Sequence, residues 1–189
     1  HFGIDPIGLA RAALANLRAG EVVAGGSTIT QQLAKNLFLT PERSLQRKLQ
    51  ELALALWLEA RLSKEEILTL YLNRVYLGAG AWGVEAAAQR YFGKSAKEVT
   101  LSEAAMLAGL LKAPSALAPT RELGRARERA ALVLGRMVEE GYIAPEEAAV
   151  ARGRPARIVR AVRVELAGSA RRRHPKAQVR VRQGYYVAE

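Results

Sequence analysis

The sequence predicts a mostly α-helical protein, and two observations carry that prediction. Signals for the start of a helix recur along the chain, each a capping Asp, Ser or Thr followed by Pro or, three residues later, by Glu. They stand at Asp5, Thr40, Ser63, Ser95 and Thr100. Half of the 189 residues are hydrophobic, which excludes a disordered chain and suffices for one domain with a sizeable core.

The first three helices are expected before residue 62. The first follows an opening Asp-Pro pair and is closed by Gly20, a residue that adopts the left-handed conformation at little cost. The second starts beside Ser27 or Thr28, either of which can cap it. A long third helix is predicted from Thr40–Pro41 through about Arg61.

Later helices follow three capping boxes, in which a hydroxyl residue is paired with Glu three positions on. These pairs are Ser63 with Glu66, Ser95 with Glu98, and Thr100 with Glu103. Pro114 and Pro119 then mark a loop. One helix is expected over about 120–140, and Pro145 opens another.

The chain changes character after the last helix. Partial alternation with β-branched residues over 158–166 and 179–187 predicts short strands. Eleven of the 29 basic residues but only two of the 18 acidic ones lie from residue 151 on, so this part carries +9 and the first 150 residues +2. The expected division is a domain over 1–152 and a basic, β-containing linker over 153–189.

The composition of the chain excludes several classes of site and function. There is no cysteine, which excludes disulfides, thiolate metal sites and a cysteine nucleophile. The most apolar run, Leu52 to Leu58, is far shorter than the roughly 20 residues of a membrane span. A basic tail is typical of a solvated linker, of an anionic membrane surface or of nucleic-acid binding. No aromatic residues are interleaved with its arginines, so nucleic acid is the minor reading.

Residues 25–36, GGSTITQQLAKN, form the most informative motif. Two glycines permit a close approach of the backbone, and a capped helix follows. Thr28, Gln32 and Lys35 have i, i+4 and i+7 spacing and share one helix face. A hydroxyl, an amide and an ammonium beside a helix N-terminus suit an anionic ligand that carries sugar hydroxyls. The alternative is a capped amphipathic helix with a solvated polar face.

Glu51 is the candidate catalytic carboxylate. It lies four residues after Arg47, so the two can form an ordinary surface ion pair, although the order basic-then-acidic is the weaker one in a helix. Glu51 also directly precedes the apolar run, where a helix is expected to be buried on most sides. From the residues alone, a functional site and a helix salt bridge are both open.

Four blocks in a fixed order resemble the family 51 peptidoglycan glycosyltransferases. Besides the motif at 25–36 and RKLQE at 47–51, they include EILTLYLN at 66–73, GAGAWGV at 78–84, YFGK at 91–94 and EAAMLAGL at 103–110. The resemblance covers about residues 1–150. These enzymes are the glycan-polymerising domains of class A penicillin-binding proteins and their monofunctional relatives, and GYYV at 184–187 is similar to the start of the connection to a transpeptidase domain.

The resemblance implies a lysozyme-like, two-lobed, mostly α fold and a site. Glu51 matches an essential glutamate that acts on the leaving-group side. The substrate-binding positions carried over, with Lys48 added as a candidate cation, are His1, Thr28, Gln32, Lys35, Asn36, Arg47, Lys48 and Lys112. The implied reaction polymerises lipid II into β-1,4-linked strands, with inversion and with undecaprenyl pyrophosphate as the leaving group.

The family's first block is matched only in part. His1-Phe2-Gly3-Ile4-Asp5 fits its end, and the Glu-Asp pair whose glutamate is the general base would precede His1. The expectation is an N-terminally truncated piece, inactive by itself, of an enzyme held at the outer face of the inner membrane by an N-terminal helix. No tightly bound cofactor is expected; Mg²⁺ or Mn²⁺ is the candidate ion, and Glu51 its candidate ligand.

Expected partners are lipid II, the growing glycan strand, the membrane surface and other cell-wall synthesis proteins, but not nucleic acid. Inhibitors of the moenomycin type are expected to bind. Two other functions stay open. One is a hydrolase or lytic transglycosylase on the same fold, which needs a protonated acid and not the cations. The other is a non-catalytic module that binds lipid-linked sugar.

Overall fold

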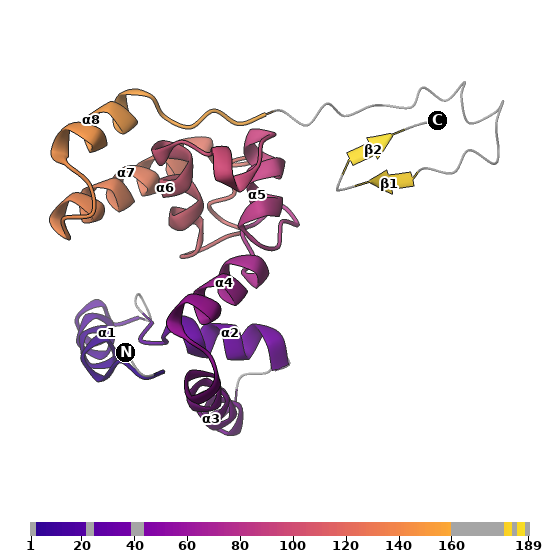
Figure 1. Cartoon of the computed structure of the whole chain (residues 1–189). Coiled ribbons are helices and arrows are strands. Elements are labelled where there is room, and N and C mark those ends of the chain that lie inside the picture. Colours follow the sequence, from indigo (N-terminus) through magenta and orange to yellow (C-terminus); the bar gives the residue numbers. More distant parts are fainter. Residues whose placement is uncertain (1–2, 22–24, 39–43, 160–179, 183–184, 188–189) are drawn as a thin grey trace.

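The computed structural model describes residues 3–21, 25–38, 44–159, 180–182 and 185–187, and the described chain is mostly α-helical, as predicted (Figure 1). Its helices are α1 (Pro6–Ala19), α2 (Ile29–Phe38), α3 (Leu45–Arg61), α4 (Lys64–Arg74), α5 (Val84–Phe92), the 3₁₀ turn η1 (Ala96–Glu98), α6 (Leu101–Leu110), α7 (Leu123–Glu139) and α8 (Pro145–Gly153).

The helices after α1 form two groups. In the first, α2 packs against both α3 and α4; in the second, α6 packs against α5, α7 and α8 (Figure 1). The contact between α4 and α5 joins the groups. A single hydrophobic core runs through both, from Leu33 on α2 to Ala156 after α8. The site described below lies in the first group.

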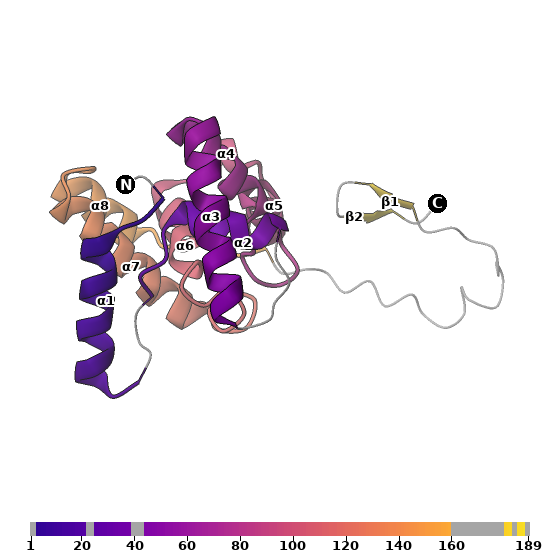
Figure 2. The same ribbon diagram turned by 90° about the horizontal axis from the view of Figure 1, so that it is seen from below.

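Helix α1 stands beside these groups (Figures 1 and 2). It packs against no other helix among the described residues, and instead rests on the segment that leads into α2. A Cβ added to Gly26 would lie 2.8 Å from the Cα of Leu9, a distance that side chains do not reach. Glycine at position 26 therefore allows α1 to approach the start of α2.

Most predicted helix ends are confirmed. Asp5 caps α1, Gly20 closes it with φ +68°, and all three predicted capping boxes form, although the one at Ser95 opens η1. The predicted start of the third helix at Thr40–Pro41 is wrong. Ser44 has an extended backbone and its hydroxyl accepts from the Arg47 amide, so α3 begins at Leu45; residues 39–43 lie outside the described chain.

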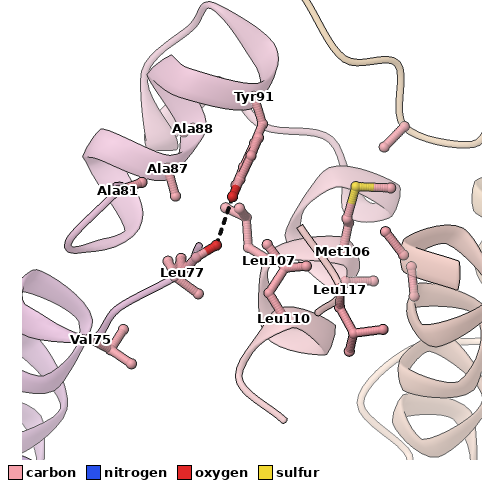
Figure 3. Packing of buried hydrophobic residues seen from close by; sticks show 14 of the residues in the cluster. Val75, Leu77, Ala81, Ala87, Ala88, Tyr91, Met106, Leu107, Leu110 and Leu117 are labelled. Atoms are coloured by element: carbon pink, nitrogen blue, oxygen red, sulfur yellow. Dashed lines mark hydrogen bonds between the residues drawn. The ribbon is translucent and has the colours of Figure 1, made fainter. Parts of the chain in front are cut away.

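The second group of helices is built around Tyr91. Its side chain is fully buried, and its hydroxyl donates to the carbonyl of Leu77 at 2.8 Å (Figure 3). Burial raises the pKa of Tyr91 to about 12, so the hydroxyl keeps the proton that it donates. Next to Leu77, Gly78 has φ +87°, and a Cβ there would lie 2.3 Å from the Pro114 carbonyl oxygen. This turn is therefore closed tightly against the loop after α6.

The expected strands are found in part. Two short antiparallel strands, β1 (Arg180–Arg182) and β2 (Tyr185–Val187), replace the single strand predicted over 179–187. Ile158 and Val159 belong to no strand, and the rest of 158–166 lies outside the described residues. None of the described helices combines the length and the apolar character needed to span a bilayer.

Replacing Tyr91 by phenylalanine is expected to lower the free energy of unfolding by about 1–3 kcal/mol, because the buried Leu77 carbonyl loses its hydrogen-bond donor. Urea denaturation of the two proteins measures the difference. Tyr142→Phe is the matched control, since that side chain is 78% exposed. Equal stability of the Tyr91 variant and the parent would contradict the role assigned to this hydrogen bond.

Candidate active site

Packing of α2 on α3 brings the N-terminus of α2 next to the first turns of α3. Thr28 starts α2, since its hydroxyl accepts from the Gln31 amide at 3.2 Å. Ser44 starts α3 in the same way, through the Arg47 amide at 3.1 Å. The start of α2 and the basic side chain of Lys48 on α3 therefore meet.

Glu51 is buried between two cations of its own helix. Its side chain is only 5% exposed. Arg47 approaches one carboxylate oxygen at 3.1 Å, and the Lys48 ammonium donates to the other at 3.0 Å. The predicted Arg47–Glu51 pair is thus formed, but it is buried and shared with Lys48 rather than exposed on the surface. We call these three residues the Glu51 cluster.

Lys48 connects the Glu51 cluster to α2. Besides Glu51, its ammonium donates to the Ser27 hydroxyl at 2.9 Å and to the Gln31 side-chain oxygen at 3.1 Å. The side chain remains half exposed. Gln31 is not among the site residues predicted from the sequence. The sequence could have indicated Gln31, because it lies three positions after Thr28 and next to Gln32. The i, i+4 and i+7 spacing instead favoured Gln32.

The other end of Gln31 contacts the N-terminal segment. Its side-chain amide and the Thr28 hydroxyl both donate to the carbonyl of Gly3, each at 2.9 Å. Gly3 is buried with φ +72°, and a Cβ there would lie 3.3 Å from Glu59 on α3. Two residues earlier stands His1, a predicted site residue that lies outside the described part of the chain. Gly3 itself is thus held against the start of α2.

The remaining predicted residues are more scattered. The Gln32 side-chain oxygen accepts from the Tyr71 hydroxyl at 3.2 Å, which turns it away from Lys48. Lys35 and Asn36 are exposed near the end of α2. Lys112 is exposed in the turn after α6, in the other group of helices, and no hydrogen bond or ion pair between described residues joins it to the Glu51 cluster. The roles of these four residues stay predictions.

A cavity of about 680 Å³ adjoins the cluster, bounded by α1, residues 25–30 and the start of α4. Thr28 and Gln32 line it, whereas Lys48 and Glu51 do not. Arg11 and Lys64 contribute cations to its wall. The volume is in the range of small-molecule sites. The charged groups and the cavity are therefore adjacent, joined at Ser27, which lines the cavity and accepts from Lys48.

The arrangement favours an anion. Arg47 and Lys48 carry two positive charges against the single negative charge of Glu51, and the N-terminus of α2 adds unpaired amides and a partial positive charge. Arginine and lysine donors make the stronger, charge-assisted hydrogen bonds to phosphate oxygens. Because Glu51 orients both cations, it acts here as their support.

A resident metal ion does not fit these residues. Each oxygen of Glu51 already contacts a cation, and no cluster of three or more His, Cys, Asp or Glu side chains with a metal-binding arrangement exists among the described residues. The predicted link between Glu51 and Mg²⁺ or Mn²⁺ therefore gains no support from this geometry.

Comparisons with known proteins agree with the resemblance seen in the sequence. A family model described as Transglycosylase matches residues 1–138. Penicillin-binding protein 1A of Aquifex aeolicus is 60% identical over 147 residues, which is 78% of this chain and 20% of that protein. Penicillin-binding protein 1A of Escherichia coli K12 is 53% identical over 147 residues, 78% of this chain and 17% of that protein.

A crystal structure of penicillin-binding protein 1A from Haemophilus influenzae is 42% identical in sequence and has a TM-score of 0.49. The alignment covers 69% of this chain and 16% of the crystallised chain. The chain spans about a fifth of the length of the curated relatives it matches. The family model covers well over half of the chain, and the Glu51 cluster lies within the matched residues. The chain belongs to the transglycosylase family.

Proposed function

We propose that this chain is the peptidoglycan glycosyltransferase part of a cell-wall synthase and that it polymerises lipid II. The acceptor's C4 hydroxyl attacks the anomeric carbon of the donor sugar, the bond to undecaprenyl pyrophosphate breaks, and the configuration is inverted. The observation that carries the proposal is the buried Glu51 held between Arg47 and Lys48 within the transglycosylase match.

In this reaction the Glu51 cluster stabilises the leaving group. Negative charge grows on the pyrophosphate as the glycosidic carbon is transferred, and oriented cations and helix amides stabilise it without having to reorganise. Arg47 and Lys48 supply those cations; Glu51 holds both, and Lys48 reaches the start of α2. The hydroxyl proton passes to a base outside the Glu51 cluster, assigned to the glutamate that the family resemblance places before His1, since both oxygens of Glu51 contact cations.

The adjoining cavity supplies room for a sugar. Its polar wall includes Thr28, Thr30 and Gln32, while Ile67 and Leu68 provide apolar surface. Hydroxyl and amide groups beside apolar surface are typical of carbohydrate-sized sites. We assign this cavity to the disaccharide that is attached to the pyrophosphate.

A lipid-linked substrate also requires a membrane surface nearby. Phe38 at the end of α2 and Leu45 and Leu49 on the first turns of α3 are 54%, 87% and 68% exposed. Large apolar side chains so close to Lys48 suit the acyl boundary of a bilayer, where the lipid tail remains. The proposed location is the outer face of the inner membrane, with lipid II and the glycan strand as partners and no role for nucleic acid.

The second candidate is a lytic transglycosylase or hydrolase that cleaves glycan strands. Such enzymes place a protonated carboxylic acid in an apolar pocket. Glu51 instead contacts a guanidinium and an ammonium, an arrangement suited to an anionic leaving group. The geometry thus favours polymerisation, and assay of isolated peptidoglycan for cleavage separates the two activities.

Glu51→Gln, made in the full-length protein that the gene encodes, is expected to reduce glycan-strand synthesis from lipid II by about two orders of magnitude or more. The amide keeps the shape of the carboxylate but no longer holds two cations. Strand formation is followed by gel separation of labelled products. Glu139→Gln is the matched control, because Glu139 pairs with Arg136 on the surface of α7. Unchanged synthesis by the Glu51 variant would refute the proposed role, and absence of synthesis by a folded parent would refute the proposed function.

Lys48→Gln is expected to weaken binding of inorganic pyrophosphate, a stand-in for the leaving group, by about tenfold, because one positive charge beside the start of α2 is lost. Titration calorimetry on the 189-residue chain measures the affinity at low and high salt. Lys97→Gln, an exposed lysine on η1, controls for loss of one positive charge. If the two variants lose affinity equally, Lys48 is not an anion ligand.

A further inference from the structure

Helix α3 carries a second buried carboxylate that the proposed reaction does not use. Glu59 lies eight residues after Glu51, about 12 Å farther along the helix, and its side chain is 7% exposed. The Thr30 hydroxyl donates to one of its oxygens at 2.6 Å, and the ammonium of Lys64 pairs with the other. Glu59 thus joins α2, α3 and α4.

Glu59 is held as an anion. Burial alone raises the pKa of its carboxyl, but hydrogen bonds from Lys64 and Thr30, the charge of Lys64 and the amide of Gly3 together outweigh burial. The pKa therefore lies below its ordinary value of 4.5. A buried anion held by the Thr30 hydroxyl and the Lys64 ammonium is a rigid anchor, because any rotation leaves a charged oxygen without a partner.

Gly3 links Glu59 to the candidate active site. Gly3 lies against Glu59, since a Cβ on Gly3 would be 3.3 Å from the Glu59 Cγ, while the carbonyl of Gly3 accepts from Thr28 and Gln31. Gly3 is therefore held from two sides, by α3 through this close contact and by α2 through its carbonyl. Its position depends on Glu59 at one end and sets the position of the Gln31 side chain at the other.

The orientation of Gln31 follows from donor and acceptor chemistry. A carbonyl accepts and an ammonium donates, so the amide nitrogen of Gln31 has to face Gly3 and its oxygen has to face Lys48. Hydrogen bonds thus run from Gly3 through Gln31 to Lys48 and from there to Glu51, and Glu59 contacts Gly3 at the far end.

We propose that Glu59 is a positioning residue for the glycosyl-transfer site, which it serves by holding Gly3 so that Gln31 directs the Lys48 ammonium toward the leaving group. The inference rests on the proposed function. Glu59 does not contact the reacting atoms in this assignment. Its loss is expected to misdirect Lys48 while the fold persists, because the hydrophobic core shared by the helices is unaffected.

The chain contains a matched control for this proposal. Glu103 is likewise a nearly buried carboxylate, paired with Lys94 at 3.1 Å. Its other partner is the start of α6, where it completes the capping box with Thr100. Glu103 has no hydrogen bond to the site residues among the described chain, so Glu103→Gln reproduces the loss of a buried ion pair without touching Gly3.

The first test compares Glu59→Gln with Glu103→Gln in the full-length protein. For Glu59→Gln we expect kcat for strand synthesis to fall about tenfold or more with KM for lipid II little changed, the result of misplacing a group that acts on the transition state. Glu103→Gln is expected to lower stability with kcat unchanged. Equal kcat for both folded variants overturns the inference. A folded parent that makes no strands overturns the proposed function instead.

The second test needs no activity. Hydrogen exchange of the Gly3 amide and the Gln31 side-chain amide is measured by NMR on the 189-residue chain. Both are expected to exchange about tenfold faster or more in Glu59→Gln than in the parent, while Glu103→Gln leaves them unchanged. Thr30→Val, which removes one donor, should have a smaller effect of the same kind, and Thr30→Ser should restore protection. Unaltered exchange in Glu59→Gln overturns the inference.

The charge of Glu59 also predicts a pH dependence of stability. Its pKa is lowered on folding, so its stabilisation is complete above the unfolded pKa of about 4.5 and is lost as pH falls through the folded value. The difference in free energy of unfolding between the parent and Glu59→Gln should therefore be constant from pH 6 to 7 and shrink below about pH 4. Urea denaturation across this range measures it, and a difference independent of pH would contradict an anionic Glu59.

Discussion

The site depends on one constraint: a carboxylate removed from water must find partners for its charge. Helix α3 carries two such groups, Glu51 and Glu59, with side chains 5% and 7% exposed. Their partners come from α3 itself, the start of α2 and the start of α4. Matching these two charges therefore orients the polar side chains where the first group of helices meets, while the hydrophobic core holds the helices together.

At the start of α2, Thr28 and Gln31 each make more than one of the hydrogen bonds that hold the site. Thr28 caps the helix and also donates to Gly3, while Gln31 contacts both Gly3 and Lys48. These residues sit on the first turn of a helix whose inner face, at Leu33 and Ala34, is fully buried. Because a packed helix carries them, their geometry does not depend on a loose loop, which is the arrangement that an oriented site requires.

The sequence predicted what depends on neighbours along the chain. The three capping boxes, the Asp5 cap and the Gly20 end are local patterns, and all of them form. Glu51 is buried, but the expectation that the apolar run after it is buried on most sides is wrong, because Leu56 and Trp57 are 45% and 50% exposed. Contacts between distant segments were not predictable in this way. Gln31 rather than Gln32 faces Lys48 because of how α2 is rotated against α3, and no spacing within α2 contains that rotation.

The net charge of the chain, which composition gives, does not indicate where the candidate anion site lies. Most of the excess charge, +9 of the net +11, lies from residue 151 on, far along the chain from the Glu51 cluster. The cluster itself has a net charge of only +1. What favours an anion there is the orientation of two cations by a buried carboxylate, next to a helix N-terminus. Charges in solvent are screened over about 10 Å at 0.1 M salt, whereas partly buried donors keep their strength. The candidate anion site therefore lies in the nearly neutral first 150 residues rather than in the basic tail.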